Sequence, residues 1–338
     1  MFLSFQKVIK AGFILNFTFF CLLFFSTQVS AIVYEPVPEV KFPDNNPWSK
    51  EKEELREKLF FDPILSRDNS VSCSTCHKPE KFYTDGLPQS VGISRQPLKR
   101  NSPTIFNSAF QKTLFWDGRA GSLEEQVLMP IQDKNEMDQD LKNLVRELIS
   151  KAEYRKLFEE AFGSSGITPE RLAMAIAPFE RTLVTGDTSY DRFWQGDKKA
   201  MSPSALRGMD LFSGKAKCSI CHSGPLFTDQ QFHNIGLSIS GSKHDKGRKN
   251  VTGEIFHEGA FKTPGLRGIS LSGPYMHDGS LPSLKLVIEF YDQGGVASQR
   301  KSPFISPIGL SDNEKEDLLQ FLMSLGIENE NYKATVRK

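Results

Sequence analysis

Two short segments of the chain carry the same arrangement of metal-binding side chains. They are Cys73-Ser74-Thr75-Cys76-His77 and Cys218-Ser219-Ile220-Cys221-His222. Two cysteines separated by two residues and followed at once by a histidine are the signature of c-type haem attachment. The thiols bond to the haem vinyl groups, and the adjacent histidine ligates the iron. We therefore expect two covalently bound haem c groups, with His77 and His222 as the proximal iron ligands.

Other uses of paired cysteines fit this pattern less well. A zinc ribbon separates its cysteine pairs by about 15–20 residues, whereas Cys76 and Cys218 stand in different halves of the chain. A redox pair would follow a strand in a thioredoxin-like unit, and none is indicated. A disulfide would need no histidine after both pairs. The remaining cysteine, Cys21, lies in an apolar N-terminal run, so none is left for a structural disulfide.

The first 31 residues have the composition of an export signal. Lys7 and Lys10 precede an apolar run from Ala11 to Phe25, and Val29-Ser30-Ala31 supplies small residues for cleavage. The run is shorter than the about 20 residues that span a bilayer. We expect a signal peptide over 1–31, cleaved in preference to serving as an anchor. Export to the periplasm also suits haem attachment, which takes place outside the cytoplasm.

Size and repetition predict two mature domains. The chain has 338 residues, the length of about two ordinary domains. Phe82-Tyr83-Thr84-Asp85 follows the first motif and Phe227-Thr228-Asp229 follows the second, which indicates duplication of one haem domain. We place the two cytochrome c-like domains at 32–195 and 196–338. The net charge of +1 without clustered Lys and Arg argues against nucleic acid as a partner.

The fold class is predicted as mostly α, with long loops and little strand. Helix starts are indicated by Ser49, Thr168-Pro169 and Ser202-Pro203, and by capping boxes at Ser122/Glu125 and Ser311/Glu314. The helices they predict cover 49–60, 122–128, 168–183, 311–325 and a segment from 202. Apolar spacing adds helices over 138–148 and 281–291.

From about Ser49 to Leu325 the chain resembles the bacterial di-haem cytochrome c peroxidases and their MauG-like relatives. The matching stretches are Leu59-Phe60-Phe61-Asp62, Arg100-Asn101-Ser102-Pro103-Thr104, Phe115-Trp116-Asp117-Gly118-Arg119-Ala120, Asn135-Glu136-Met137, Phe261-Lys262-Thr263-Pro264, Leu266-Arg267 and Pro274-Tyr275-Met276-His277-Asp278-Gly279. In such proteins the first haem meets hydrogen peroxide and the second passes electrons.

The resemblance implies roles for individual residues. Glu136 is similar to the acid–base carboxylate above the first haem, which moves a proton between the peroxide oxygens. By itself it would be interpreted as a solvated residue near a helix start. Gln126 and Pro130 match residues of the same pocket. Trp116 resembles the tryptophan between the haems, where an indole can relay electrons, although a core role is the usual one for tryptophan.

The resemblance also implies sites around the haems. Asn101 matches the side-chain ligand of a calcium ion, and Ser272 and Pro274 match its carbonyl ligands, a donor set that suits this cation. Arg248 and Arg267 are candidate partners for the haem propionates, with a plain surface role as the alternative.

The chain departs from the classical members at the open side of both haems. The loop Gly86–Arg100, where those members carry a distal histidine, contains none. We expect a first haem that is five-coordinate or water-bound and needs no reductive activation. Tyr291 stands where classical members have a methionine and MauG-like proteins have tyrosine. It is the expected sixth ligand of the second haem, with Met276 as the rival and simple packing of Tyr291 as the alternative.

The other histidines are not expected to bind iron. His277 is expected to lie near the second haem without ligating it. The remaining three, His233, His244 and His257, are expected to be surface or structural residues.

Three functions remain open from the sequence. The first is a peroxidase that reduces hydrogen peroxide to water with electrons from a small cytochrome c or copper protein. The second is a MauG-like enzyme that uses peroxide to oxidise residues of a partner protein. The third is an electron carrier without catalysis, against which Glu136 and the missing histidine argue. The family resemblance also implies a homodimer.

Overall fold

The computed structural model describes residues 34–237 and 245–327. The predicted signal peptide and His244 lie outside the described residues. Within the described part of the chain, no helix is both long and apolar enough to cross a membrane.

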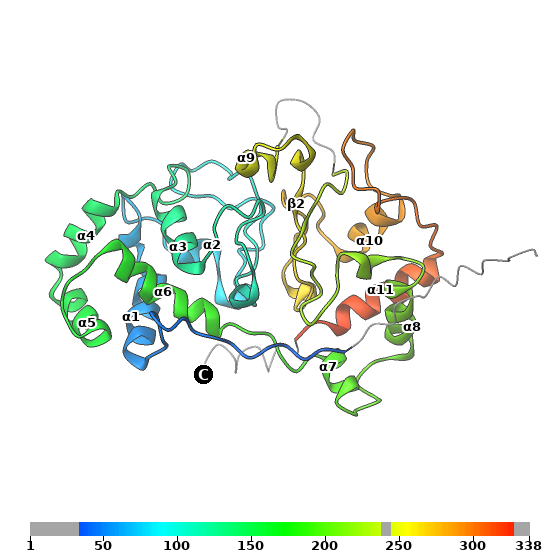
Figure 1. Ribbon diagram of the computed structural model, residues 1–338, viewed down its shortest axis with the longest axis horizontal. Coiled ribbons are helices and arrows are strands. Elements are labelled where there is room, and N and C mark those ends of the chain that lie inside the picture. Colours follow the sequence, from blue (N-terminus) through cyan, green and yellow to red (C-terminus); the bar gives the residue numbers. More distant parts are fainter. Residues whose placement is uncertain (1–33, 238–244, 328–338) are drawn as a thin grey trace, which may run out of the picture.

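The protein is mostly helical, as predicted, and its helices gather at two ends of the molecule with loops between them (Figure 1). The first half contains α1 Lys50–Phe61, η1 Pro63–Leu65, α2 Cys73–Cys76, η2 Pro79–Lys81, η3 Ser108–Phe110, α3 Leu123–Gln132, α4 Leu141–Ser150, α5 Ala152–Phe162 and α6 Pro169–Thr182. The second half contains α7 Ser189–Trp194, α8 Pro203–Ser213, η4 Cys218–Ile220, α9 Lys249–Thr252, η6 Ile255–His257, η7 Ile269–Leu271, α10 Leu284–Asp292 and α11 Asp312–Ser324.

The sheet content is small. The strands β1 Phe232–His233 and β2 Phe261–Lys262 pair antiparallel, with Phe232 opposite Lys262. This ladder lies between the two helical ends (Figure 1), so it occupies the region into which the loops of both halves converge.

Most predicted helix starts are confirmed by their caps. Ser49, Thr168, Ser202 and Ser311 each accept a backbone hydrogen bond from the first turn, and Ser311 forms the full box with Glu314. A cap of this kind contributes about 1 kcal/mol because it satisfies an otherwise free N–H group.

Three boundaries and one capping box were predicted wrongly, and one of these boundaries is the start of α4, which begins at Leu141 after its Asp140 cap instead of at 138. The Ser122 side chain accepts from the Glu125 amide, but the Glu125 carboxylate accepts from Gly121 instead of Ser122. The helix α3 also continues past Leu128 to Gln132. The helix α10 begins at Leu284, because Ser283 caps it. The helices α2, α5, α7 and α9 had no sequence prediction.

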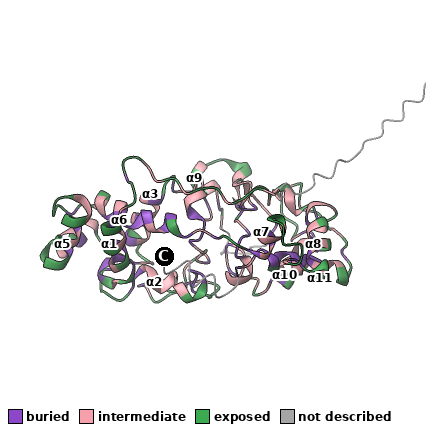
Figure 2. Ribbon diagram, turned by 90° about the horizontal axis from the view of Figure 1, so that it is seen from below, coloured by how far each residue is buried: buried purple, intermediate pink, exposed green. Residues whose placement is uncertain are grey.

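Each half has its own hydrophobic cluster. In the first half α6 packs against α1 and α3, with Leu55, Leu59 and Ile176 fully buried. In the second half α8 packs against α11 through Phe212 and Phe321. Buried residues concentrate at both places (Figure 2). The predicted domain boundary at residue 195 stays a prediction.

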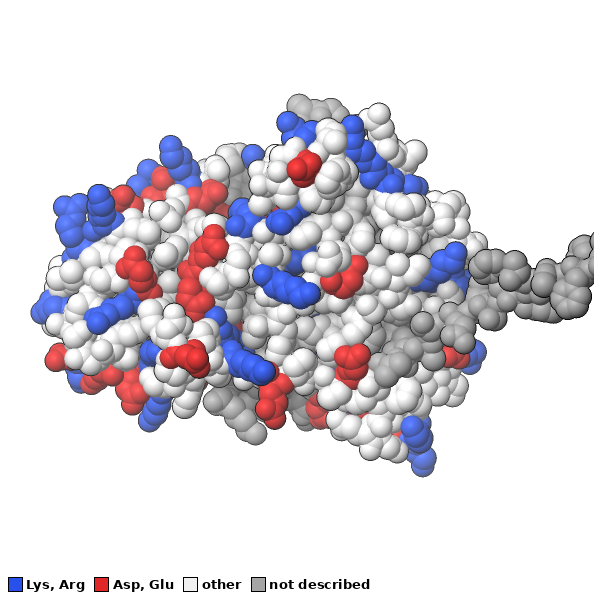
Figure 3. Space-filling view, in the orientation of Figure 1, with Lys and Arg blue, Asp and Glu red and all other residues white. Residues whose placement is uncertain are grey.

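The two ends of the described chain cross between the halves. Tyr34 packs beside Tyr190 and Trp194 of α7, and the following segment runs along the bottom of the molecule to α1 (Figure 1). Ile327 instead joins an aromatic cluster that contains Phe60 and Phe82 of the first half. These crossings hold the halves together. Figure 3 shows acidic and basic side chains interspersed over one face of the molecule.

Candidate active site

The first cysteine motif forms a single helical turn. At the start of α2 the Ser72 amide donates to the Thr75 hydroxyl oxygen, the Thr75 amide donates to the Ser72 carbonyl oxygen, and His77 ends the turn. The Nδ1 atom of His77 lies 3.0 Å from the carbonyl oxygen of Tyr83. A proton on Nδ1 donates to that carbonyl and leaves Nε2 free as the ligand atom.

The second motif repeats this arrangement. The turn η4 carries Cys218, and His222 lies beyond it with Nδ1 2.9 Å from the carbonyl oxygen of Phe227. Burial lowers the pKa of both His77 and His222, so both imidazoles are neutral at pH 7. A neutral imidazole with a fixed tautomer is what an iron ligand requires.

The four cysteine thiols are free in the structure. Burial raises the pKa of Cys73 and Cys218 to about 12, and that of Cys76 and Cys221 to about 11. Redox-active pairs have lowered thiol pKa values instead. The thiols therefore do not have the chemistry of a dithiol redox site.

A cavity of about 1390 Å³ opens beside the first motif. Its wall includes Cys73, Cys76 and His77. Protein interiors are packed with few voids larger than a water molecule, so a space of this size against two thiols and a free imidazole nitrogen fits a large prosthetic group. The residues present therefore suit haem c.

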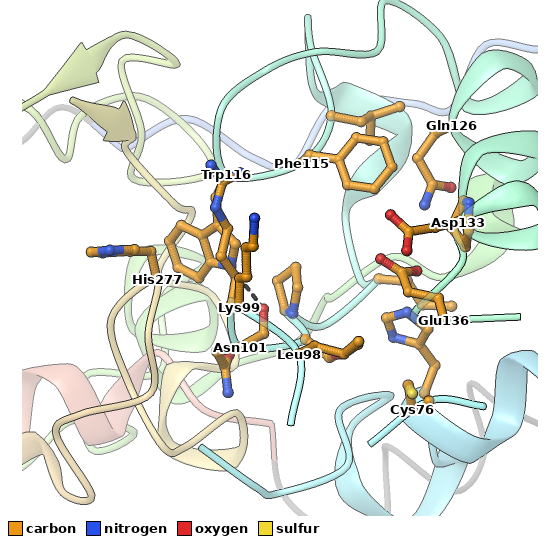
Figure 4. Close-up of a pocket in the computed structure, with 18 of the residues that line it drawn as sticks. Cys76, Leu98, Lys99, Asn101, Phe115, Trp116, Gln126, Asp133, Glu136 and His277 are labelled. Carbon is orange, nitrogen blue, oxygen red and sulfur yellow. Dashed lines mark hydrogen bonds between the residues drawn. The ribbon is translucent and has the colours of Figure 1, made fainter. Parts of the chain in front are cut away.

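The carboxylate of Glu136 points into this cavity. Figure 4 shows Gln126, Asp133 and Glu136 on one side, Cys76 below and Trp116 across from them. Burial and the neighbouring Asp133 raise the pKa of Glu136 to about 7, against a smaller opposing effect of Arg119. A carboxyl group of this pKa exchanges protons readily at neutral pH. Pro130 lines the same wall.

The loop Gly86–Arg100 fixes the backbone of Glu136. The amide of Ile93 donates to the Glu136 carbonyl oxygen at 2.8 Å. A Cβ atom on Gly92 would lie 2.1 Å from the Asn135 carbonyl oxygen and 2.7 Å from that of Glu136. The loop can lie this close to the carbonyl oxygens of Asn135 and Glu136 only because residue 92 is glycine.

Trp116 is held at both ends. Its indole Nε1 donates to the Asn101 carbonyl oxygen at 2.9 Å, and its own carbonyl accepts from the Lys262 amide at 2.8 Å. Beside it, His277 stacks on Phe261 with ring centres 3.6 Å apart. Trp116 and His277 both line the cavity wall that faces the second half of the molecule (Figure 4).

Tyr291 lies beside the second motif. Burial raises the pKa of its phenol, and the sulfur atoms of Cys218 and Cys221 are close enough to raise it further. Met276, the rival ligand, has a left-handed backbone with φ 75° and accepts from the Gly279 amide through its carbonyl. Ligation of the second haem by Tyr291 or by Met276 stays a prediction.

The residues of the predicted calcium site have other partners as well. The Nδ2 atom of Asn101 donates to the Leu87 carbonyl oxygen at 2.9 Å. The side-chain oxygen Oδ1, the expected ligand atom, takes no part in that bond. Ser272 donates to the Ile269 carbonyl, and Pro274 follows a cis peptide bond. The calcium ligands stay a prediction.

The two candidate propionate partners are engaged with the protein. Arg248 donates to the carbonyl oxygens of Asp117 and Gly118. Arg267 forms a buried bidentate pair with Asp191, with Nη1–Oδ2 at 2.6 Å. Their predicted contact with propionates is untested.

The half-buried His233 and His257, predicted to be surface or structural residues, have local partners. His233 Nε2 lies 2.8 Å from Asp229, and His257 Nδ1 lies 2.8 Å from the Thr252 hydroxyl.

Sequence reasoning missed two buried ionisable residues of the cavity wall. Burial lowers the pKa of Lys262 to about 7, and burial raises the pKa of Glu180 to about 8. Lys262 belongs to a stretch that had been matched, but its side chain was given no role. Glu180 lies on the apolar face of α6, four residues after Ile176. This helical spacing was the signal that could have identified it as buried.

Fold and site together define a c-type cytochrome with two haem attachment sites. Residues 50–199 match the family model of the di-haem cytochrome c peroxidases. The chain is 43% identical over 290 residues to the methylamine utilization protein MauG of Methylorubrum extorquens, covering 86% of this chain and 82% of that one.

It is 36% identical over 307 residues to the cytochrome c551 peroxidase of Pseudomonas aeruginosa, covering 88% of this chain and 85% of the relative. A solved structure of a MauG-like protein associated with microbial copper homeostasis superimposes with a TM-score of 0.80 at 34% identity, covering 87% and 94% of the two chains. The chain belongs to the di-haem cytochrome c peroxidase family and is a peroxidase with two c-type haems.

Proposed function

We propose that hydrogen peroxide is reduced in the cavity above His77, with Glu136 as the acid–base group. Cys73, Cys76 and His77 would hold the first haem, whose iron supplies the binding and redox chemistry for peroxide. The observation that carries the proposal is the Glu136 carboxyl, which faces this cavity with its pKa raised to about 7.

Glu136 has one task in this scheme. Its carboxylate accepts the proton of the peroxide oxygen nearer the iron and returns it to the farther oxygen. The farther oxygen then leaves as water when the O–O bond breaks. General acid–base catalysis of this kind contributes about 10²–10⁴ in rate. Gln126 and Pro130 shape the space around the reacting oxygens.

Electrons for the reduction arrive from the second half of the molecule. His222 and, in our proposal, Tyr291 hold the second haem, and Trp116 lies between the two sites. The donor is a small cytochrome c or copper protein.

We further propose that the signal peptide 1–31 directs export to the periplasm and that Asn101, Ser272 and Pro274 hold a calcium ion. The mature chain would divide into domains at 32–195 and 196–338 and would form a homodimer.

A second candidate is oxidation of residues in a partner protein, as in MauG-like enzymes. The loop Gly86–Arg100 offers no histidine to close the first haem, and Tyr291 stands beside Cys218 and Cys221. A hard phenolate ligand stabilises oxidised iron better than a thioether does. If this candidate is right, the protein should store the oxidising equivalents of peroxide when no reductant is present.

One spectroscopic experiment tests these candidates. The purified diferric protein is mixed with one equivalent of hydrogen peroxide, with no reductant present. A high-spin resting signal that changes at once supports the open first site, and a long-lived product supports the MauG-like candidate. Two low-spin haems that ignore peroxide until one is reduced would refute the open site and favour a classical, reductively activated peroxidase.

A further inference from the structure

An aromatic contact connects the proximal side of the second site to α7. The carbonyl oxygen of Phe227 accepts from His222, and the Phe227 ring packs edge-on against Tyr190 with ring centres 5.2 Å apart. Tyr190 is 2% exposed. The path from His222 to the Tyr190 phenol therefore consists of one hydrogen bond, one residue and one ring contact.

Tyr190 belongs to a cluster of three oxidisable rings that reaches the surface. Its ring centre lies 6.4 Å from Trp194 and 5.8 Å from Tyr34. Tyr34 and Trp194 stack with centres 5.9 Å apart and an interplanar angle of 15°. Trp194 is 36% exposed. Tyrosine and tryptophan are the side chains most easily oxidised by one electron through an aromatic ring.

The charge beside the buried ring of this cluster is balanced, whereas at the surface the Lys198 ammonium lies 5.8 Å from the Trp194 ring centre. The guanidinium of Arg267 lies 6.0 Å from the Tyr190 ring centre and 5.9 Å from that of Phe227. An isolated cation there would oppose removal of an electron from either ring. Asp191 pairs with Arg267 through two hydrogen bonds of 2.6 and 2.9 Å, so the pair presents no net charge to the rings.

We propose that Trp194, Tyr34 and Tyr190 form a relay that takes electrons from a protein reductant at the surface and passes them toward His222. The proposal rests on the peroxide chemistry proposed above. Each transfer removes one electron from the exposed edge of the cluster, and the proton that the oxidised ring loses to solvent returns to it when the ring is reduced again. Two electrons and two protons convert one hydrogen peroxide to two waters. The reductant then restores the oxidised ring.

The relay defines the class of partner. A folded protein cannot enter the cavity beside His77, but it can touch Trp194. The partner is therefore a redox protein that presents its own donor group at the surface of α7. Small reductants that diffuse into the cavity do not need the relay.

The test uses the intact holoprotein, treated with hydrogen peroxide without a reductant. Without a donor the oxidised ring cannot be restored, so it should acquire oxygen. Peptide mass spectrometry measures this gain at Trp194 and at Trp48, which is 48% exposed. Among the described residues, Trp48 makes no aromatic ring contact. We expect oxidation several times greater at Trp194. Equal oxidation, or more at Trp48, would indicate attack from solution and overturn the relay.

Variants separate the relay from a structural role. Trp194→Phe should keep the peroxide-induced spectral change and turnover with a small reductant, while oxidation of a reduced cytochrome c falls several-fold. Trp194→Tyr should restore much of the loss, because tyrosine is also oxidisable. The control Trp48→Phe should change neither.

Each outcome has one meaning. Full cytochrome oxidation by Trp194→Phe would exclude the relay. A holoprotein whose haems do not respond to peroxide at all would instead refute the proposed function, because the relay variants leave that response intact.

Discussion

The two haem-binding regions are built alike on one side and differently on the other. In both, the proximal histidine bonds to a backbone carbonyl a few residues downstream, at 3.0 Å for His77 and 2.9 Å for His222. Opposite His77 lies a cavity with Glu136 on its wall, whereas Tyr291 lies beside the second pair of cysteines. In the proposed function, the duplicated half-site holds the cofactor and the unduplicated residues determine its chemistry.

The duplication is also imperfect within the shared half. Phe82 and Phe227 occupy equivalent sequence positions and both have φ 56°. The carbonyl that receives the histidine proton is that of Phe227 in the second region but that of Tyr83, one residue later, in the first. Tyr83 also has a left-handed backbone, with φ 53°. Two consecutive left-handed residues turn the first region differently after its motif.

Removal of the proximal ligands gives the largest expected effect and tests whether the two regions have separate roles. His77→Gly should abolish peroxide turnover and leave the spectrum of the second haem unchanged, because the iron at the first site loses its protein ligand. His222→Gly should retain a peroxide-induced spectral change at the first haem but lose turnover with a protein donor. Absorption spectra and turnover assays distinguish the two.

The control for this pair is His257→Gly, since His257 bonds only locally to Thr252. Equal loss of the peroxide response in the His77 and His222 variants would show that the regions do not divide the work.

Replacement of the cavity carboxyl comes next. Glu136→Gln should lower peroxide turnover by about 10²–10⁴-fold, because the amide cannot accept the peroxide proton. In the proposed mechanism, the ionised form of Glu136 is the active one. Since its pKa is raised to about 7, the wild-type rate should increase as pH rises through that value. The variant should have lost this rise.

The matched control is Glu180→Gln, which changes another carboxyl of the same wall whose pKa is raised by burial, to about 8. It should keep the turnover rate and the rise near pH 7. A wild-type pH profile unchanged by Glu136→Gln would remove Glu136 from the proton transfer.

The prediction of the haem-holding half of the site rests on local signals, whereas that of the open half rests on the family resemblance. The spacing of the cysteines and histidines predicts haem attachment. The cap residues Ser49, Thr168 and Ser311 alone predict where their helices begin. The glycine at 92, by contrast, has no local signal, because its need arises from Asn135, which is distant in sequence. The Glu125 carboxylate had two amides in reach and bonds that of Gly121.

The proposed axial ligand of the second site should set its potential. If Tyr291 ligates the iron, Tyr291→Met replaces a hard anionic donor by a soft thioether, which stabilises the reduced iron. The midpoint potential of the second haem should rise by a substantial part of the roughly 0.8 V that axial ligands span. A spectroelectrochemical measurement tests this shift. Tyr291→Phe should leave an open site, and an unchanged potential in both variants would mean that Tyr291 only packs beside the haem.

The smallest expected effect concerns the loop that supports Glu136. Gly92→Ala places a methyl group against the Asn135 and Glu136 carbonyl oxygens, so the loop must shift away from the carboxyl. Overpacking of this kind costs about 1–3 kcal/mol in the free energy of unfolding. Because Ile93 bonds the Glu136 carbonyl, we expect turnover to fall together with stability and the pH profile near 7 to shift.

Gly186→Ala is the control for that variant, because an added Cβ at position 186 meets no atom within 4 Å. It should retain the wild-type stability or gain a few tenths of a kcal/mol from the stiffer unfolded chain. Thermal unfolding and pH-dependent turnover of both variants, measured side by side, give the comparison. If Gly92→Ala loses stability but keeps the wild-type pH profile, the loop supports the fold of the first region without positioning Glu136. If the profile moves, the loop that lacks a histidine has a positive role, because it sets the carboxyl over the cavity that it leaves open.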